Sequence, residues 1–167
     1  SFAKLIGTKY AVGVNSGTDA LKLSLKALKV GYGDEVITAA NTFVATIGAI
    51  TELGAKPVYV DCDDTFCLDV KQVEKKISRK TKCIIPVHFT GYMTNMPELI
   101  KISKKRKIPI VEDACQSILG EVNGKKAGTW GEMGAFSLHP LKNINVWSDG
   151  GIITTNNSKF YKTLKLL

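Results

Sequence analysis

Short apolar segments alternate along the chain with stretches of helical period, and this alternation limits the fold more than any other feature. Seven apolar segments bounded by turn residues predict strands, at residues 8–14, 34–40, 56–62, 82–89, 107–114, 132–138 and 150–155. Residues with helical period occupy 18–30, 43–53, 70–77, 96–106 and 158–167. Strands that alternate with helices predict an α/β fold.

The strands at residues 82–89 and 107–114 are apolar at consecutive positions, in CIIPV and IPIV. Such runs are expected where helices cover both faces of a mainly parallel sheet. We therefore predict three layers, with one mixed, mainly parallel sheet of seven strands between helices. Residues 121–155 show no good helix, so loops are expected to join the strands there, and such loops commonly carry binding groups.

Composition fits a folded domain and excludes several classes of protein. The 167 residues are 44% hydrophobic and 23% charged, which is not the profile of a disordered chain. The four cysteines form no CxxC pair and have no histidine at metal-ligand spacing, so buried thiols are favoured over a zinc or redox site. No apolar run is long enough to cross a membrane, and the first residues do not resemble a signal peptide, so a cytoplasmic protein is expected.

The charge is basic, with 23 Lys and Arg against 15 Asp and Glu, a net charge of +8. This balance raises nucleic acid and anionic ligands as partners. Only two of the basic residues are arginines, and the lysines are spread over the predicted helices without aromatic residues between them. We favour solvated helix faces over a nucleic-acid or membrane surface. A positive field near a pocket would also favour a nucleotide diphosphate.

The first candidate for chemistry is the turn NSGT, where the first strand passes into a helix. Asn15, Ser16 or Thr18 can cap this helix, and Gly17 allows a ligand to approach the backbone. The free N–H groups of such a turn bind anions, most naturally a phosphate. Simple helix capping explains the turn equally well, and neither GxGxxG nor GxxxxGKS is present.

The second candidate is the acidic pair Glu112 and Asp113, which directly follows a buried strand. Ligands bind outside the carboxyl ends of parallel strands, so an acid there is aimed at a pocket. Adjacent strand residues point to opposite faces, and we expect only one of the two carboxylates to reach a given ligand. A cap for a following helix is the alternative interpretation.

The third candidate is Lys142, in a loop between two strands after Pro140. A lysine on a short constrained loop can serve as an amine nucleophile when it is partly desolvated. A phosphate cradle, a strand-end acid and a loop lysine on one rim of a sheet are what a pyridoxal phosphate enzyme needs. The sequence therefore predicts pyridoxal 5'-phosphate as the cofactor and no metal.

Several stretches in order along the chain resemble the DegT/DnrJ/StrS sugar aminotransferases, a family of fold-type I pyridoxal phosphate enzymes. The matching stretches are VNSGTDAL, ANTFVAT, GAKPVYVD, PVHFTG, VEDACQS and FSLHPLKN followed by DGG. The resemblance covers essentially the whole chain. It implies that residues 1–167 are part of the large cofactor-binding domain, without the family's N-terminal segment and small C-terminal domain.

The resemblance also implies roles for individual residues. Lys142 matches the Schiff-base lysine and the catalytic residue, and Asp113 matches the carboxylate that pairs with the pyridine nitrogen. The remaining matches are Gln116 near the phenolic oxygen, Gly17, Thr18 and Ser137 at the phosphate, and Phe43 stacked on the cofactor ring. His88 and Asn143 match positions near the site and receive no role. For Phe43 and His88 a plain core position is the alternative, and for Ser137 a strand-edge hydroxyl.

The implied function is transamination of a nucleotide-linked keto sugar, with an amino acid such as glutamate as donor. Some relatives replace the lysine by histidine and carry out a dehydration, so Lys142 favours amino transfer. A sugar dehydratase, an aminotransferase for a non-sugar ketone and a non-catalytic or regulatory cofactor-binding protein are the alternatives. The family further implies a homodimer with shared active sites.

Overall fold

The computed structural model describes all 167 residues and contains six α-helices and nine strands. In chain order the elements are α1 (Phe2–Ile6), β1 (Tyr10–Val14), α2 (Gly17–Ala27), β2 (Glu35–Ala39), α3 (Val44–Thr51), β3 (Lys56–Val60), α4 (Val70–Lys76), β4 (Thr81–Ile85), the 3-10 turn η1 (Phe89–Gly91), α5 (Met96–Arg106), β5 (Val111–Asp113), β6 (Glu121–Val122), β7 (Lys125–Lys126), β8 (Met133–Ser137), β9 (Gly151–Thr155) and α6 (Ser158–Leu164). All seven strands and all five helices that the sequence predicts are present, so the α/β class is confirmed. No helix is both long and apolar enough to cross a membrane.

Two sheets form the middle layer. One has the order β1-β9-β8-β5 and the other β3-β2-β4. Strand β2 pairs in parallel with β3 and β4, and β5 pairs in parallel with β8, whereas β9 is antiparallel to both of its neighbours. Strands β1, β2, β4, β5 and β8 therefore share one direction, and their carboxyl ends meet at one rim.

The prediction of one continuous seven-stranded sheet is not confirmed. Strands β4 and β5 are joined only by two isolated bridges, Ile84 with Ile110 and Val87 with Asp113. Pro86 lies between these bridges and has no N–H to donate, so the ladder cannot run through it. Its carbonyl still accepts from the Asp113 N–H at 2.9 Å, which keeps the two sheets adjacent.

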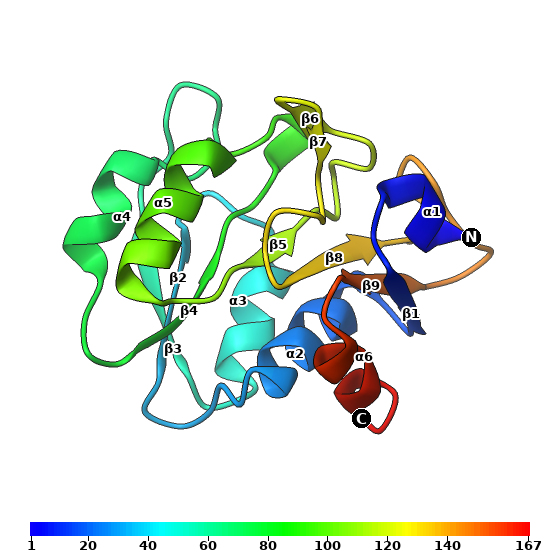
Figure 1. Cartoon of the computed structure of the whole chain (residues 1–167), viewed down its shortest axis with the longest axis horizontal. Coiled ribbons are helices and arrows are strands. Elements are labelled where there is room, and N and C mark those ends of the chain that lie inside the picture. Colours follow the sequence, from blue (N-terminus) through cyan, green and yellow to red (C-terminus); the bar gives the residue numbers. More distant parts are fainter.

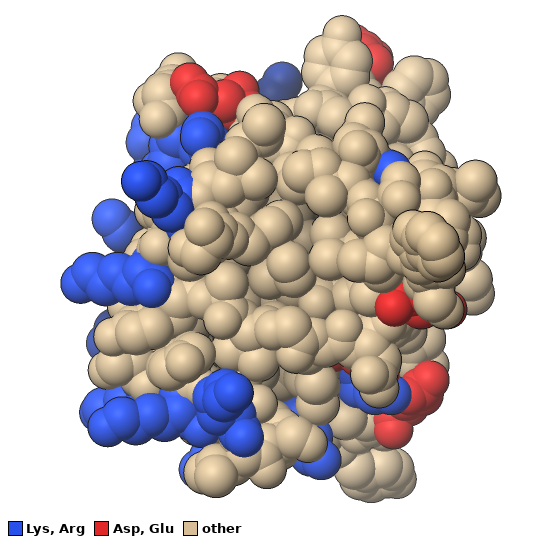
Figure 2. Space-filling view, turned by 90° about the vertical axis from the view of Figure 1, so that its right-hand side faces the viewer, with Lys and Arg blue, Asp and Glu red and all other residues tan.

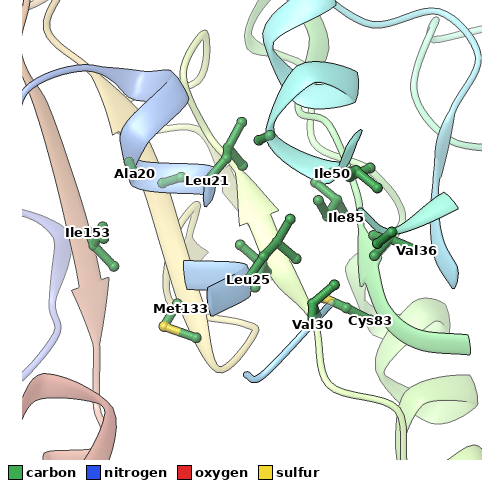
Figure 3. Close-up of a cluster of buried hydrophobic side chains, with 14 of the residues drawn as sticks. Ala20, Leu21, Leu25, Val30, Val36, Ile50, Cys83, Ile85, Met133 and Ile153 are labelled. Atoms are coloured by element: carbon green, nitrogen blue, oxygen red, sulfur yellow. The ribbon is translucent and has the colours of Figure 1, made fainter. Parts of the chain in front are cut away.

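Helices cover both faces of this layer (Figure 1). Helices α2, α3 and α6 contribute to the larger buried cluster on one face, and α4 and α5 contribute to the cluster on the other. Adjacent residues of β2 show why the strands are apolar throughout: Val36 belongs to the first cluster and Ile37 to the second. Figure 3 shows Leu21 and Leu25 of α2 and Ile50 of α3 packed toward Ile85.

The structure contains a short helix, α1, and a short hairpin of β6 and β7 that the sequence did not predict. Helix α1 has five residues, too few to show a helical period, and it ends at Gly7 with φ of 93°. Strands β6 and β7 have two residues each and pair as a hairpin through Asn123 and Gly124, both at positive φ. The hairpin lies in residues 121–155, where loops are expected, and no helix occurs in that segment.

Glu112 is fully buried at the end of β5 and organises two loops around it. Its carboxylate accepts hydrogen bonds from the backbone N–H groups of Gly128, Trp130 and Gly131 at 2.7 to 2.9 Å. It also pairs with His88 Nε2 at 3.1 Å. Since the Thr94 N–H donates to His88 Nδ1, the Nε2 atom carries the proton toward Glu112. Four donors thus compensate the burial of one carboxylate.

We expect Glu112→Gln to lower the free energy of unfolding by about 3 kcal/mol, because an amide cannot accept from every donor around it. Urea unfolding of the variant measures this loss. Glu121→Gln is the matched control, since Glu121 is exposed in β6 and its change should stay within about 0.5 kcal/mol. Equal losses in both variants would contradict the role given to Glu112.

Candidate functional site

A cavity of about 260 Å³ opens at the rim where the carboxyl ends of the parallel strands meet. Its walls come from the segments that follow β1, β2, β4, β5 and β8, which is where ligands bind in open α/β sheets. All seven predicted site residues line it: Gly17, Thr18, Phe43, Asp113, Gln116, Ser137 and Lys142. The structure thus brings into one cavity residues from distant parts of the sequence.

The first turn of α2 forms one end of the cavity. Ser16 caps the helix, and its Oγ accepts from the Asp19 N–H at 3.0 Å. The first intrahelical bond runs from the Ala20 N–H to the Ser16 carbonyl, so the N–H groups of Gly17 and Thr18 precede the hydrogen-bonded turn. The interpretation as a cap is therefore confirmed, and it leaves two N–H donors for an anion.

Close packing around this turn explains the glycine at position 17. A Cβ there would lie 2.7 Å from Ser137 Cβ and 2.9 Å from Cys115 Sγ. Gly151, which pairs with Ser137, approaches the same turn, because a Cβ there would lie 2.2 Å from the Ser16 carbonyl oxygen. The helix terminus thus packs closely against the end of β8 and the start of β9, with Ser137 beside Gly17.

The two adjacent acids at the end of β5 point to opposite sides, as the sequence predicts. Asp113 lines the cavity, whereas Glu112 faces the loop of residues 128–131. Asp113 is 6% exposed, and its Oδ2 accepts from Thr46 Oγ1 at 2.8 Å while its Oδ1 accepts from the Cys115 N–H at 3.2 Å. No helix follows directly, so the interpretation of Asp113 as a helix cap is wrong.

Lys142 lies in the loop between β8 and β9, half-buried at the cavity wall. The loop is tightly turned there, because the Lys142 N–H donates to the His139 carbonyl at 2.8 Å and the Leu141 N–H donates to His139 Nδ1 at 3.2 Å. Asn145 Nδ2 also donates to the Lys142 carbonyl. These bonds hold the backbone at Lys142 in a tight turn, although the whole loop spans residues 138–150.

Phe43 and Gln116 stand at the cavity wall in different ways. Phe43 is the residue before α3 and is 66% exposed, so the interpretation as a plain core residue is wrong. Gln116 is half-buried, and its Oε1 accepts from the Thr90 N–H at 2.9 Å. Together with Leu141 and Lys142, Gln116 also borders a second, more open hollow of about 550 Å³.

Cys115 lines the same cavity as Asp113 and Lys142. Burial raises the pKa of the Cys115 thiol well above its usual value, and the neighbouring Asp113 carboxylate adds to this shift, while Lys142 opposes it. The thiol therefore stays protonated at neutral pH and is a poor nucleophile. Among the groups that line the cavity, this leaves the Lys142 amine as the better candidate nucleophile.

The sequence analysis missed several residues of the cavity. The most informative are Thr42 and Thr46, which lie four residues apart and hydrogen-bond to each other. Thr46 also donates to Asp113. Their spacing at the start of a predicted helix was the available signal. His88 is fully buried and pairs with Glu112, so it does not line the cavity, and Asn143 borders only the second hollow.

The basic charge of the chain does not gather at the cavity. Lys142 is the only lysine or arginine among the lining residues, which also include the two acids Asp113 and Asp149. In the face shown in Figure 2, uncharged residues cover the centre, lysines and arginines gather along the left side and the lower edge, and acidic residues lie near the upper and right edges. The sequence-based expectation of a positive field at the pocket therefore has no support from the lining residues.

We expect Gly17→Ala to lower the free energy of unfolding by about 2 kcal/mol, because the methyl group must displace Ser137 or Cys115. Gly13→Ala is the matched control, since a Cβ at the exposed Gly13 meets nothing within 4 Å. Thermal or urea unfolding compares the two. A Gly17→Ala chain as stable as wild type would show that the turn is not held as described.

Comparison with known proteins agrees with this geometry. The family model of the DegT/DnrJ/EryC1/StrS aminotransferases matches residues 1–167. The chain is 43% identical over 160 residues to a "pleiotropic regulatory protein" of Geobacillus stearothermophilus, covering 95% of the chain and 43% of that protein. It is 41% identical over 164 residues to a UDP-N-acetyl-3-dehydro-alpha-D-glucosamine 3-aminotransferase of Acidithiobacillus ferrooxidans, covering 98% and 44%.

Solved structures show the same fold. Streptomyces venezuelae DesV in complex with a ketimine intermediate superposes with a TM-score of 0.96 at 39% identity, covering 99% of this chain and 45% of that chain. The GDP-4-keto-6-deoxymannose-3-dehydratase ColD superposes with a TM-score of 0.92 at 35% identity, covering 98% and 44%. The chain spans less than half the length of these relatives. The match over its whole length shows that the chain belongs to the DegT/DnrJ/EryC1/StrS aminotransferase family.

Proposed function

We propose that the cavity binds pyridoxal 5'-phosphate and that the protein transfers an amino group from an amino acid to a nucleotide-linked keto sugar. The single observation that carries this proposal is the convergence of Gly17, Asp113 and Lys142 on one cavity. These residues supply backbone donors for a phosphate, a carboxylate and a primary amine. Two relatives support the same chemistry by name: the Acidithiobacillus 3-aminotransferase and DesV, whose structure is of a complex with a ketimine intermediate.

The residues present fit this cofactor. The N–H groups of Gly17 and Thr18 precede the first hydrogen-bonded turn of α2, and the positive end of the helix favours a phosphate. Because position 17 is a glycine, Ser137 can pack directly against this turn, and its hydroxyl adds a further donor. The cavity also holds an acid for a cationic ring nitrogen and an amine for an aldehyde.

When bound, pyridoxal phosphate supplies an electron sink for carbanion chemistry at an amino acid's α-carbon. Lys142 would hold the cofactor covalently through Nζ, and Asp113 would hold a proton on the ring nitrogen by charge pairing. Phe43 would stack on the ring face, and Gln116 would lie near the phenolic oxygen. Thr18 and Ser137 would join Gly17 at the phosphate.

With the cofactor bound, the Lys142 amine would serve as general base and acid. Its Nζ would take the proton from the α-carbon of the donor amino acid in one half-reaction and deliver a proton to the sugar carbon that receives the amine in the other. The hydrogen-bonded turn at His139 holds the backbone of Lys142 beside the cavity. Hydrogen bonds to both of its oxygens hold the Asp113 carboxylate in place at the cavity wall.

Glutamate is the amino donor that we propose, and the sugar carries a nucleoside diphosphate. The relatives' names support a nucleotide-linked sugar. We also propose that two copies of the protein form a homodimer with shared active sites. Phe43 and Leu141 line the cavity and are 66% and 88% exposed, which supports a covered surface there.

A sugar dehydratase is the second candidate, and the likeness to ColD favours it. The lysine at position 142 favours transamination, because a lysine both holds the cofactor and moves the proton. The regulatory name of the Geobacillus relative supports a third candidate, a cofactor-binding protein without turnover. Bleaching of the bound cofactor's visible band by glutamate separates turnover from cofactor binding alone. The mass of the sugar product separates transamination, which adds an amine, from dehydration, which removes water.

We expect the chain mixed with pyridoxal phosphate to give a visible absorption band that borohydride converts into a stable adduct. Peptide mapping by mass spectrometry should place this adduct on Lys142, because its amine alone among the lysines lines the cavity. Lys142→Ala should abolish the adduct.

Lys105→Ala is the matched control, because Lys105 is exposed on α5 and pairs with Glu74. It should form the adduct like wild type. Adducts scattered over exposed lysines, or an undiminished adduct in Lys142→Ala, would contradict the proposed cofactor site.

A further inference from the structure

Two threonines without a role in the proposed function, Thr42 and Thr46, form a chain of hydrogen bonds that ends at Asp113. Thr46 is 1% exposed in α3, and its Oγ1 donates a hydrogen bond of 2.8 Å to Asp113 Oδ2. Thr42 lies one helical turn earlier at the cavity wall, with 2.8 Å between the two hydroxyl oxygens. The single hydroxyl proton of Thr46 is donated to Asp113 Oδ2. In the bond between the two hydroxyls, Thr42 is therefore the donor and Thr46 the acceptor.

The second oxygen of the carboxylate is held from another element. Asp113 Oδ1 accepts from the Cys115 N–H at 3.2 Å, and the Asp113 carbonyl accepts from the His88 N–H at 3.0 Å. Each oxygen of the Asp113 carboxylate therefore accepts a hydrogen bond, one from α3 and one from the turn after β5. Rotation of the carboxylate would break at least one of these bonds, so its remaining lone pairs have a fixed direction.

Helix α3 reinforces this arrangement. Thr46 lies in the first turn of α3, whose positive end is thus placed beside the Asp113 carboxylate. Thr46 and Asp113 are only 1% and 6% exposed, so bulk solvent has little access to the bond between them. A valine would fill the space of Thr46 equally well but would leave Asp113 Oδ2 without its donor.

We propose that Thr46 is a positioning residue, and that the chain of hydrogen bonds from Thr42 through Thr46 sets the orientation in which Asp113 meets the ring nitrogen of the cofactor. This inference rests on the proposed function, because pyridoxal phosphate is the ligand that the carboxylate would pair with. Thr46 acts only through Asp113 and supplies no atom to the reaction.

The test compares Thr46→Val and Thr46→Ser by titration with pyridoxal phosphate, followed by absorbance. Thr46→Val should weaken binding about tenfold, since a hydrogen bond to a charged group is lost, and should shift the visible band of the bound cofactor. Thr46→Ser keeps the hydroxyl and should restore both the affinity and the position of the band. A purely structural role would not move the band or respond to serine.

Thr38→Val is the matched control. Thr38 is fully buried in β2 and donates one hydrogen bond of 2.9 Å to the Ile85 carbonyl, and it does not line the cavity. Its loss should reduce stability without changing cofactor affinity or the visible band. Thr42→Val removes only the outer donor and should weaken binding about threefold, so it carries the test where Thr46→Val does not fold.

The outcomes separate the two proposals. A wild-type chain that gives no visible band with pyridoxal phosphate overturns the proposed function itself. A wild-type chain that binds the cofactor, with Thr46→Val or Thr42→Val binding it as tightly and with an unchanged band, overturns the positioning role alone. Failure of Thr46→Ser to restore a defect seen in Thr46→Val also overturns it, because the hydroxyl would not be the cause.

Discussion

The hydrogen bonding of two adjacent carboxylates at the end of β5 is the constraint on which the site depends. Glu112 is fully buried and uses four donors to hold the loop of residues 128–131 and His88. Strand geometry then turns its neighbour Asp113 toward the opposite side, into the cavity. The buried acid and the acid of the site are thus coupled through one short strand.

Close backbone approach is the second constraint. Gly17 and Gly151 leave no room for a side chain, so the start of α2 lies directly against the ends of β8 and β9. This contact places the free N–H groups of the helix beside Ser137. The loop that carries Lys142 begins at the same end of β8. The N–H donors for an anion and the primary amine are therefore brought to the cavity by the same packing contact.

Much of this arrangement follows from the sequence, for identifiable reasons. Periodicity predicts the strands and helices, and the alternation of side chains along a strand predicts that only one acid of the pair enters the cavity. Pro86 breaks the ladder between β4 and β5, an effect that the sequence contained but the strand pattern did not reveal. The bond between Thr46 and Asp113 joins residues 67 positions apart, and no local pattern predicts such a pair.

A crystal structure of the chain with pyridoxal phosphate tests the central claim most directly. The account predicts the phosphate within hydrogen-bond distance of the Gly17 and Thr18 N–H groups, the ring nitrogen beside Asp113 and a covalent link to Lys142 Nζ. Cofactor bound elsewhere on the chain, or bound in the cavity with its phosphate away from the start of α2, would contradict it.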